Sequence, residues 1–511
     1  MLHRSAFPEG FRQSLFLSFL RQSACSAVLT YEAVIIRHRS VWYVLLALLA
    51  SLSVAAASAK QSSSAKPSPA LDREFQAAVA QYDSGHYAEA VVSLEKILPL
   101  VPESFEVHEL LGLTYSAESQ DEKANLHLEK AVRLKPNSAA ARTNLAANLS
   151  RLGKLDLAET QFKKAAELEP RSYDTNHNLG ESYVRSGHLA KAAPFLEQAQ
   201  QIDPSSYDNG CDLALAYVLT GRQADARKLA HDLLKLKDTA ELHNLLGEIE
   251  EKDGNFVPAA NEFEIAAHAD PSESNLFDWA SELLIHRTLD PAVEVFQQAS
   301  ERYPKSARLA IGLGMALNAR GNYDDAVKSL LRGADLNPSD PDCYLFLSKA
   351  YSSSPSQVEE VIVRFRRFAE LQPQNAKAQY YFAMSLWKGK RAEDSGLDLH
   401  QIEVLLKKSL ALDPKSAEAH LQLGNLYADQ NKFTESIPEY EKARELDPNL
   451  ADVRYRLGQA YVRTGKKELA QEEFAIYQKI REQHLADLDK QRAEIRQFIY
   501  SAKDGPAAKP E

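Results

Sequence analysis

The feature that most constrains this chain is a repeat of about 34 residues, which is most regular from Ala417 to Pro448. Leu423, Gly424 and Tyr427 fall on one face of a first helical segment, because residues three or four apart line one side of a helix. A polar turn follows, and a second segment of the same kind ends at Pro448, which has no backbone N–H to donate. Two short helices cannot bury their shared apolar face alone, so this unit needs copies of itself on both sides.

Twelve such units follow one another along the chain. Six of the first segments have a glycine at their eighth position, and nine of the second segments have an early alanine. Small residues at these places predict that the two helices of a unit approach closely. The units begin near Leu71, Phe105, Ala139, Tyr173, Tyr207, Ala240, Glu273, Ala307, Pro341, Ala376, Ala417 and Ala451.

This pattern resembles the tetratricopeptide repeat (TPR) family, whose signature is matched most fully at 105–136, 173–204, 307–338 and 417–448. The resemblance covers about 71–480, roughly four fifths of the chain. It implies an all-α fold, a right-handed superhelical solenoid of about twelve antiparallel helix-turn-helix repeats. In such a solenoid the first helices line a concave groove.

The residues before the repeats have the composition of an export signal. Residues 41–57 form an apolar run that follows Arg37, His38 and Arg39, and small residues end it at Ala59. Because the run is shorter than the roughly 20 residues of a spanning helix, we expect 1–59 to be a cleaved signal peptide. An uncleaved signal anchor is the alternative. Residues 60–70 are rich in Ser, Ala and Pro and are predicted to be a flexible linker.

The other end of the chain is predicted to close the array. The repeats are expected to span 71–482, followed by a capping helix at 483–502 and a disordered tail at 503–511. An insertion at 388–398 in the tenth unit is expected to be a surface loop, with a functional loop as the alternative. The apolar residues expected to lie against the last repeat are Leu485, Leu488, Ile495, Phe498 and Ile499.

Composition and motifs limit the chemistry that the chain is expected to perform. The net charge is −11, and residues outside 1–59 carry −14 because 1–59 hold five Arg and two acidic residues. An acidic body argues against nucleic acid as a partner. The three cysteines have no metal-type spacing, and no phosphate-binding, nucleophile or zinc-protease motif occurs. We therefore predict a protein that is not an enzyme, with no catalytic residue, no metal, no cofactor and no small-molecule substrate.

Partner-binding residues can be predicted from the resemblance, which implies that positions two, five, nine and twelve of each first helix face the groove. The third to sixth units place polar residues at or beside that face, and the seventh to tenth place apolar ones there, where exposed aromatic and Met side chains are typical anchors. The alternative is that some of them, Leu284 and Leu345 above all, pack as core. The polar set is Thr143, Arg151, His177, Glu181, Arg185, Asp208, Glu241, Asn244, Glu248 and Glu251. The apolar set is Phe277, Leu284, Ile311, Met315, Leu345, Tyr380, Met384 and Trp387.

These observations predict a protein–protein interaction scaffold, exported to the cell envelope, that binds a segment of a partner protein in its groove. We expect it in the periplasm or secreted. The alternative is a non-catalytic subunit of an envelope assembly, secretion or polysaccharide-export complex, anchored in the inner membrane through residues 41–57.

Overall fold

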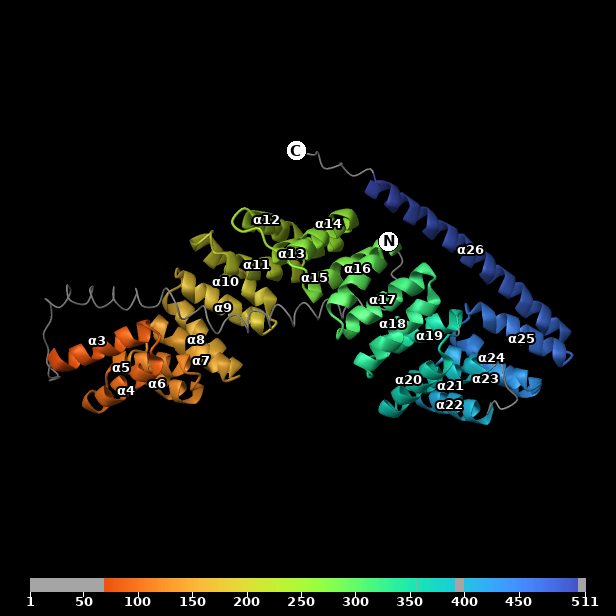
Figure 1. The fold of residues 1–511 in the computed structure, drawn as a ribbon, viewed down its shortest axis with the longest axis horizontal. Helices are drawn as coiled ribbons and strands as arrows, with labels where there is room; N and C mark the ends of the chain where they lie inside the picture. The colour runs from red at the N-terminus through yellow and green to blue at the C-terminus, as the bar shows by residue number, and fades with distance from the viewer. Residues whose placement is uncertain (1–68, 355, 391–398, 504–511) are drawn as a thin grey trace. The chain divides into compact units, whose positions relative to one another are not determined.

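The computed structural model describes residues 69–354, 356–390 and 399–503. All regular structure in these ranges is helical, with 24 α-helices, one short 3-10 helix at Leu98–Leu100 and no strand (Figure 1). The chain divides into two compact units, and the boundary between Ile249 and Glu250 lies inside helix α13. The expectation of an all-α TPR solenoid is confirmed.

Twelve helix pairs, numbered here as repeats one to twelve, make up the two units. Eleven of the predicted unit starts are the first residue of a helix, and Leu71 lies just inside α3. The first helices are α3 (Pro69–Asp83), α5 (Phe105–Ala117), α7 (Ala139–Arg151), α9 (Tyr173–Arg185), α11 (Tyr207–Leu219), α13 (Ala240–Asp253), α15 (Glu273–Ile285), α17 (Ala307–Arg320), α19 (Pro341–Ser353), α21 (Ala376–Lys390), α23 (Ala417–Asp429) and α25 (Ala451–Arg463). The second helices are α4 (Tyr87–Ile97), α6 (Asp121–Leu134), α8 (Leu155–Leu168), α10 (Leu189–Ile202), α12 (Gln223–Leu234), α14 (Phe256–Ala269), α16 (Leu289–Arg302), α18 (Tyr323–Leu336), α20 (Val358–Leu371), α22 (Leu399–Leu412), α24 (Phe433–Leu446) and α26 (Lys467–Lys503).

Short local signals start and stop these helices. Ser104 and Ser138, each two residues after a closing proline, accept a hydrogen bond from the backbone N–H three residues on and so cap α5 and α7. Just after a first helix ends, at the fifteenth position of the repeat, Gly153 has φ +71° and Gly321 has φ +92°. Glycine adopts this left-handed conformation without a steric penalty, so the chain can turn sharply into the second helix.

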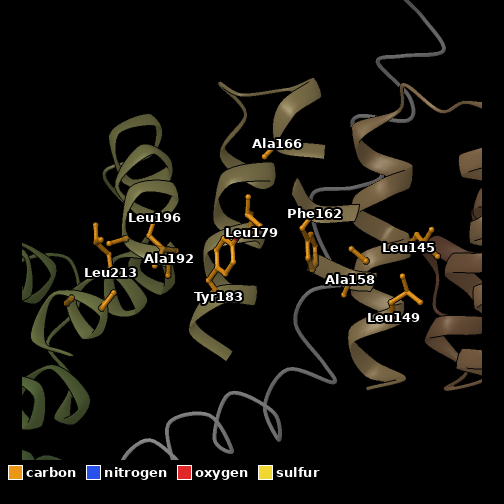
Figure 2. Packing of buried hydrophobic residues seen from close by; sticks show 14 of the residues in the cluster. Leu145, Leu149, Ala158, Phe162, Ala166, Leu179, Tyr183, Ala192, Leu196 and Leu213 are labelled. Atoms are coloured by element: carbon orange, nitrogen blue, oxygen red, sulfur yellow. The ribbon is translucent and has the colours of Figure 1, made fainter. Parts of the chain in front are cut away.

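The close approach predicted within each pair is confirmed. A Cβ atom on Gly112 would lie 2.5 Å from Cγ of Leu128, and a Cβ on Gly424 would lie 2.6 Å from Cε1 of Tyr440. The early alanines of the second helices, such as Ala158, are fully buried. Figure 2 shows how these small residues let larger side chains of repeats three to five meet in one continuous core.

Successive repeats are also joined by a hydrogen bond between a first-helix tyrosine and a glutamate of the preceding second helix. The hydroxyl of Tyr217 donates to Glu197 at 2.9 Å, and that of Tyr461 donates to Glu441 at 2.6 Å. Tyr351 occupies the same position in repeat nine, but its hydroxyl is buried without a partner. Leu331 stands where repeats four and eleven have Glu197 and Glu441, which explains the missing bond.

The end of the array differs from the prediction of a separate capping helix. Helix α26 runs without interruption from Lys467 to Lys503, and Leu485 leaves 54 % of its surface exposed. This exposure contradicts the expectation that Leu485 packs against the last repeat. The structure describes the helix here but not the side chains of Leu488, Ile495, Phe498 and Ile499.

Other predicted segments fall outside the described ranges or overlap them only slightly. Residues 1–59 and most of the linker at 60–70 are not among the described residues, although Pro69 and Ala70 already belong to α3. Of the insertion at 388–398, only 388–390 are described, as the end of α21. No helix within the described ranges is both long and apolar enough to span a membrane.

Candidate partner-binding site

Apart from Leu284 and Leu345, for which core packing was the stronger alternative, six apolar side chains were predicted to anchor a partner, and four of these six are buried instead. Phe277 and Ile311 each expose 6 % of their surface, Trp387 exposes 5 % and Met315 exposes 2 %. The prediction that these four are accessible anchors is therefore wrong. The first helices of repeats seven to ten touch one another as well as their second helices, so these positions are part of the core.

Neighbouring side chains explain two of these burials directly. The ring of Phe277 meets the ring of Phe296 edge-on at 5.8 Å, and the guanidinium of Arg308 from the next repeat lies 5.0 Å from its centroid. Ile311 packs against Gly333 so closely that a Cβ there would lie 2.7 Å from its Cγ1. The second helix of the same repeat thus covers both residues, and the following repeat adds Arg308 over Phe277.

The other apolar candidates are less deeply buried. Tyr380 and Met384 are half-buried. The ring of Tyr380 meets that of Tyr381 at 5.7 Å, and burial raises the pKa of the Tyr380 hydroxyl. Of the two residues for which core packing was the stronger alternative, Leu284 is buried and Leu345 is half-buried. Contact of Tyr380 or Met384 with a partner stays a prediction.

The charged candidates lie nearer the surface. Arg151 is exposed and donates from Nε to Oδ1 of Asp121 at 2.8 Å. Arg185 is exposed, and its guanidinium lies 3.9 Å from the Glu181 carboxylate. Glu248 is half-buried. The two arginines are thus already engaged with carboxylates of their own unit, and their binding to a partner stays a prediction.

One group of carboxylates in the first compact unit stands out, and we call it the acidic face: Glu181 of α9, Asp208 and Asp212 of α11, and Glu241 of α13. Asp208 and Glu241 are exposed, and Asp212 is half-buried. Glu181, Asp208 and Glu241 were predicted as groove positions from the sequence. In the structure the charges of these three act on the fourth residue, Asp212.

The electrostatics of the acidic face follow from burial and repulsion. Burial and then the negative charges of Glu181, Asp208 and Glu241 raise the pKa of Asp212 to about 8. Burial and Asp208 also raise the pKa of Glu241, against an opposing effect of Lys237. A positive charge placed among these carboxylates would relieve the repulsion, so the face is suited to a cationic ligand group.

Asp212 is the residue that sequence reasoning missed. It stands at the sixth position of its helix, whereas only positions two, five, nine and twelve were expected to face a partner. A signal was present, because Asp208 and Asp212 are four residues apart and like charges at that spacing repel one another on a helix. Within the described part of the chain, no group of three or more His, Cys, Asp or Glu side chains is arranged to hold a metal ion.

The repeated antiparallel helix pairs define an α-solenoid as the class of this protein. Three family models described as tetratricopeptide repeat match the chain. The first matches residues 143–207 and 277–341, the second 183–249 and the third 451–484. A fourth model, described as TPR repeat, matches 424–465. The chain belongs to the tetratricopeptide repeat family.

The curated relatives that it resembles are named as enzymes. The mouse protein O-mannosyl-transferase TMTC3 is 24 % identical over 208 residues, which is 39 % of this chain and 21 % of the mouse protein. The human protein O-mannosyl-transferase TMTC1 is 22 % identical over 31 % of this chain and 18 % of its own length. The chain thus spans about a fifth of these relatives. Their names contradict the prediction that the chain is not an enzyme.

Solved structures with similar helices add only a distant likeness. A tetratricopeptide repeat protein from Parabacteroides merdae is 16 % identical, with a TM-score of 0.39 over 48 % of this chain and 98 % of that one. Yeast Tom70 is 16 % identical, with a TM-score of 0.32 over 78 % of this chain and 96 % of that one. At these scores the likeness adds nothing to what the helix pairs themselves show.

Proposed function

We propose that this TPR scaffold binds a positively charged segment of a partner protein on the acidic face. The observation that carries the proposal is that three successive first helices, α9, α11 and α13, carry the carboxylates Glu181, Asp208 and Glu241, whose charges all act on Asp212 of α11. Protein interaction is what a TPR array supports in general, and the acidic face adds a preference for Lys and Arg.

The energetics favour a ligand over an empty face. Holding several carboxylates together costs free energy, as the raised pKa of Asp212 indicates. A lysine or arginine of the partner would offset that cost and would form charge-assisted hydrogen bonds with the exposed oxygens of Asp208 and Glu241. The apolar residues of repeats seven and eight are buried and offer no comparable contact.

Fluorescence anisotropy with a labelled oligolysine peptide tests this proposal. We expect the triple variant Asp208→Asn/Asp212→Asn/Glu241→Gln to weaken binding about tenfold or more, and added salt to weaken binding to the unchanged protein. The matched control is Glu167→Gln/Glu294→Gln/Glu370→Gln, which removes three exposed charges from second helices. Equal weakening in both triple variants would show that only net charge attracts the peptide and would overturn the proposal.

A second candidate function rests on the names of the curated relatives, protein O-mannosyl-transferases, whose substrate is by that name a protein. We propose that the repeats present a protein substrate for mannosyl transfer. Incubation of an acceptor protein with a mannosyl donor and a protein O-mannosyltransferase, with and without this chain, followed by intact-mass measurement, tests it. A gain of one hexose on the acceptor that depends on this chain is the expected result, and an unchanged acceptor mass contradicts it.

Export to the cell envelope is part of the proposal and rests on the apolar run at 41–57. Mass spectrometry of the mature N-terminus separates its two forms. A chain that begins at Lys60 fits a cleaved signal, and a chain that retains 41–57 fits an anchor.

A further inference from the structure

The fourth position of several first helices makes the same two contacts. Arg142 of repeat three donates to the carbonyl of Pro136 at 2.8 Å and to Oε1 of Gln161 at 2.7 Å. The carbonyl belongs to the proline that closes the preceding repeat, and Gln161 stands at position twenty-three, on the second helix of the same repeat. One side chain thus ties the turn before the repeat to both of its helices.

Repeat eleven makes this tie with a histidine. The ring of His420 places Nε2 3.4 Å from the carbonyl oxygen of Pro414 and Nδ1 2.6 Å from Oε2 of Glu439. As in repeat three, the residue at position twenty-three offers an oxygen that can only accept. Such a pair keeps its hydrogen bond when the imidazole is protonated, because imidazolium donates from both nitrogens.

Repeat two departs from this rule, because both positions hold histidine. His108, which is 8 % exposed, places Nε2 3.0 Å from the carbonyl oxygen of Pro102 and Nδ1 3.0 Å from Nδ1 of His127. A carbonyl only accepts, so Nε2 of His108 carries a hydrogen. The contact between the two Nδ1 atoms then needs a single hydrogen, supplied by either ring.

The number of protons on the pair decides whether this contact holds. With both rings neutral, His127 donates from Nδ1 to His108, and with one added proton a single hydrogen still lies between the rings. A second added proton puts a hydrogen on both Nδ1 atoms and a positive charge on both rings, and the hydrogen bond becomes a repulsion. Burial and then the charge of His108 lower the pKa of His127, against an opposing effect of the Glu95 charge, in keeping with repulsion between two protonated rings.

The surrounding groups do not supply the missing acceptor. Glu95 of α4 accepts a hydrogen bond from the hydroxyl of Tyr115. The Tyr115 ring stacks on His127 with 5.6 Å between centroids, and Nζ of Lys123 in α6 lies 5.1 Å from the centroid of the Tyr115 ring. In the loop before α5, Glu103 pairs with Lys130 of α6 at 2.7 Å. From α7, Arg142 is directed to Pro136 and Gln161.

We propose that His108 and His127 form a proton-sensitive closure, so that double protonation separates α5 from α6 beside Pro102 and loosens repeat two while repeat eleven stays closed. The contrast arises from one residue, since position twenty-three is histidine in repeat two and glutamate in repeat eleven.

Hydrogen exchange measured by mass spectrometry on the full chain, corrected for the intrinsic rate at each pH, tests the proposal. Between about pH 7.5 and about pH 5, we expect protection of 105–134 to fall by up to about tenfold per unit of pH below the second protonation, while 417–446 keeps its protection.

Two variants copy the other repeats and act as controls. His127→Glu reproduces the pair of repeat eleven, and His127→Gln reproduces the acceptor of repeat three, so both should abolish the loss of protection in 105–134. The proposal is overturned if the unchanged chain keeps its protection at low pH, or if the variants lose as much as it does. Protection at about pH 7.5 verifies that each variant is folded.

Discussion

The first helices of repeats four to six and those of repeats seven to ten were both expected to face a partner, and the structure separates them. In repeats four to six, Asp208 and Glu241 stay exposed and their charges act on the half-buried Asp212. In repeats seven and eight, Phe277 at position five and Met315 at position nine are buried. Position nine shows the contrast directly, because it is the half-buried Glu181 in repeat four and the buried Met315 in repeat eight.

The difference shows how side-chain chemistry decides the role of a shared position. An aromatic ring gains free energy when the next repeat covers it, as Arg308 covers Phe277. A carboxylate without a cationic partner loses free energy when it is covered, so Asp208 stays in contact with water. An apolar residue at a groove position is thus weaker evidence of binding than a charged one.

The largest effect is expected at Phe277. Phe277→Ala should lower the free energy of unfolding of its repeats by about 3–5 kcal/mol, because it leaves a cavity against Phe296 and removes the contact with Arg308. Asp208→Ala, at an exposed position of the other region, should change it by no more than about 0.5 kcal/mol. Urea denaturation followed by circular dichroism measures both. If Phe277→Ala proves as mild as Asp208→Ala, the two regions do not differ as described.

Replacing Asp212 should raise the stability of the chain, whereas replacing Phe277 should lower it. Its pKa is raised in the folded chain to about 8 from a usual value of 3.8, so the folded state holds the extra proton. The stability that this group contributes is therefore present at low pH and is lost as pH rises through about 8. Asp212→Asn should stabilise the chain near neutral pH by on the order of 1–3 kcal/mol and flatten that pH dependence. Thermal melts between about pH 5 and about pH 8 measure it, and a destabilised variant at neutral pH would argue against the crowding of carboxylates.

A smaller effect on stability is expected from the tyrosine hydroxyls that lie between successive repeats. Tyr461→Phe removes the bond to Glu441 and should cost about 1 kcal/mol, whereas Tyr351→Phe removes a buried hydroxyl without a partner and should be neutral or stabilising. Denaturation midpoints of the two variants give the comparison. Equal losses would mean that the Tyr–Glu bond is not what stabilises the contact.

The smallest effect is expected at a turn. Arg287 has φ +61° at the fifteenth position of repeat seven, where Gly254 of repeat six has φ +81°. Arg287→Gly should gain about 0.5–1 kcal/mol by relieving that strain, and Gly254→Ala should lose a similar amount. A lower melting temperature for Arg287→Gly would contradict this reading of the turn.

The sequence predicted the fold in detail, because the packing signature is local and repeated. Gly112 faces Leu128 and Gly424 faces Tyr440, as the spacing required. It could not predict which groove positions the next repeat would cover, since that depends on contacts such as Arg308 over Phe277. It also missed Asp212, whose importance arises only from its burial and from carboxylates on neighbouring helices that act on it.

The central claim is that a cationic segment binds the acidic face and not the apolar helices of repeats seven to ten. Hydrogen exchange of the full chain with and without saturating oligolysine peptide tests it most directly. Slower exchange confined to α9, α11 and α13 is the predicted result. Slower exchange in α15, α17 or α21, with α11 unchanged, would contradict it.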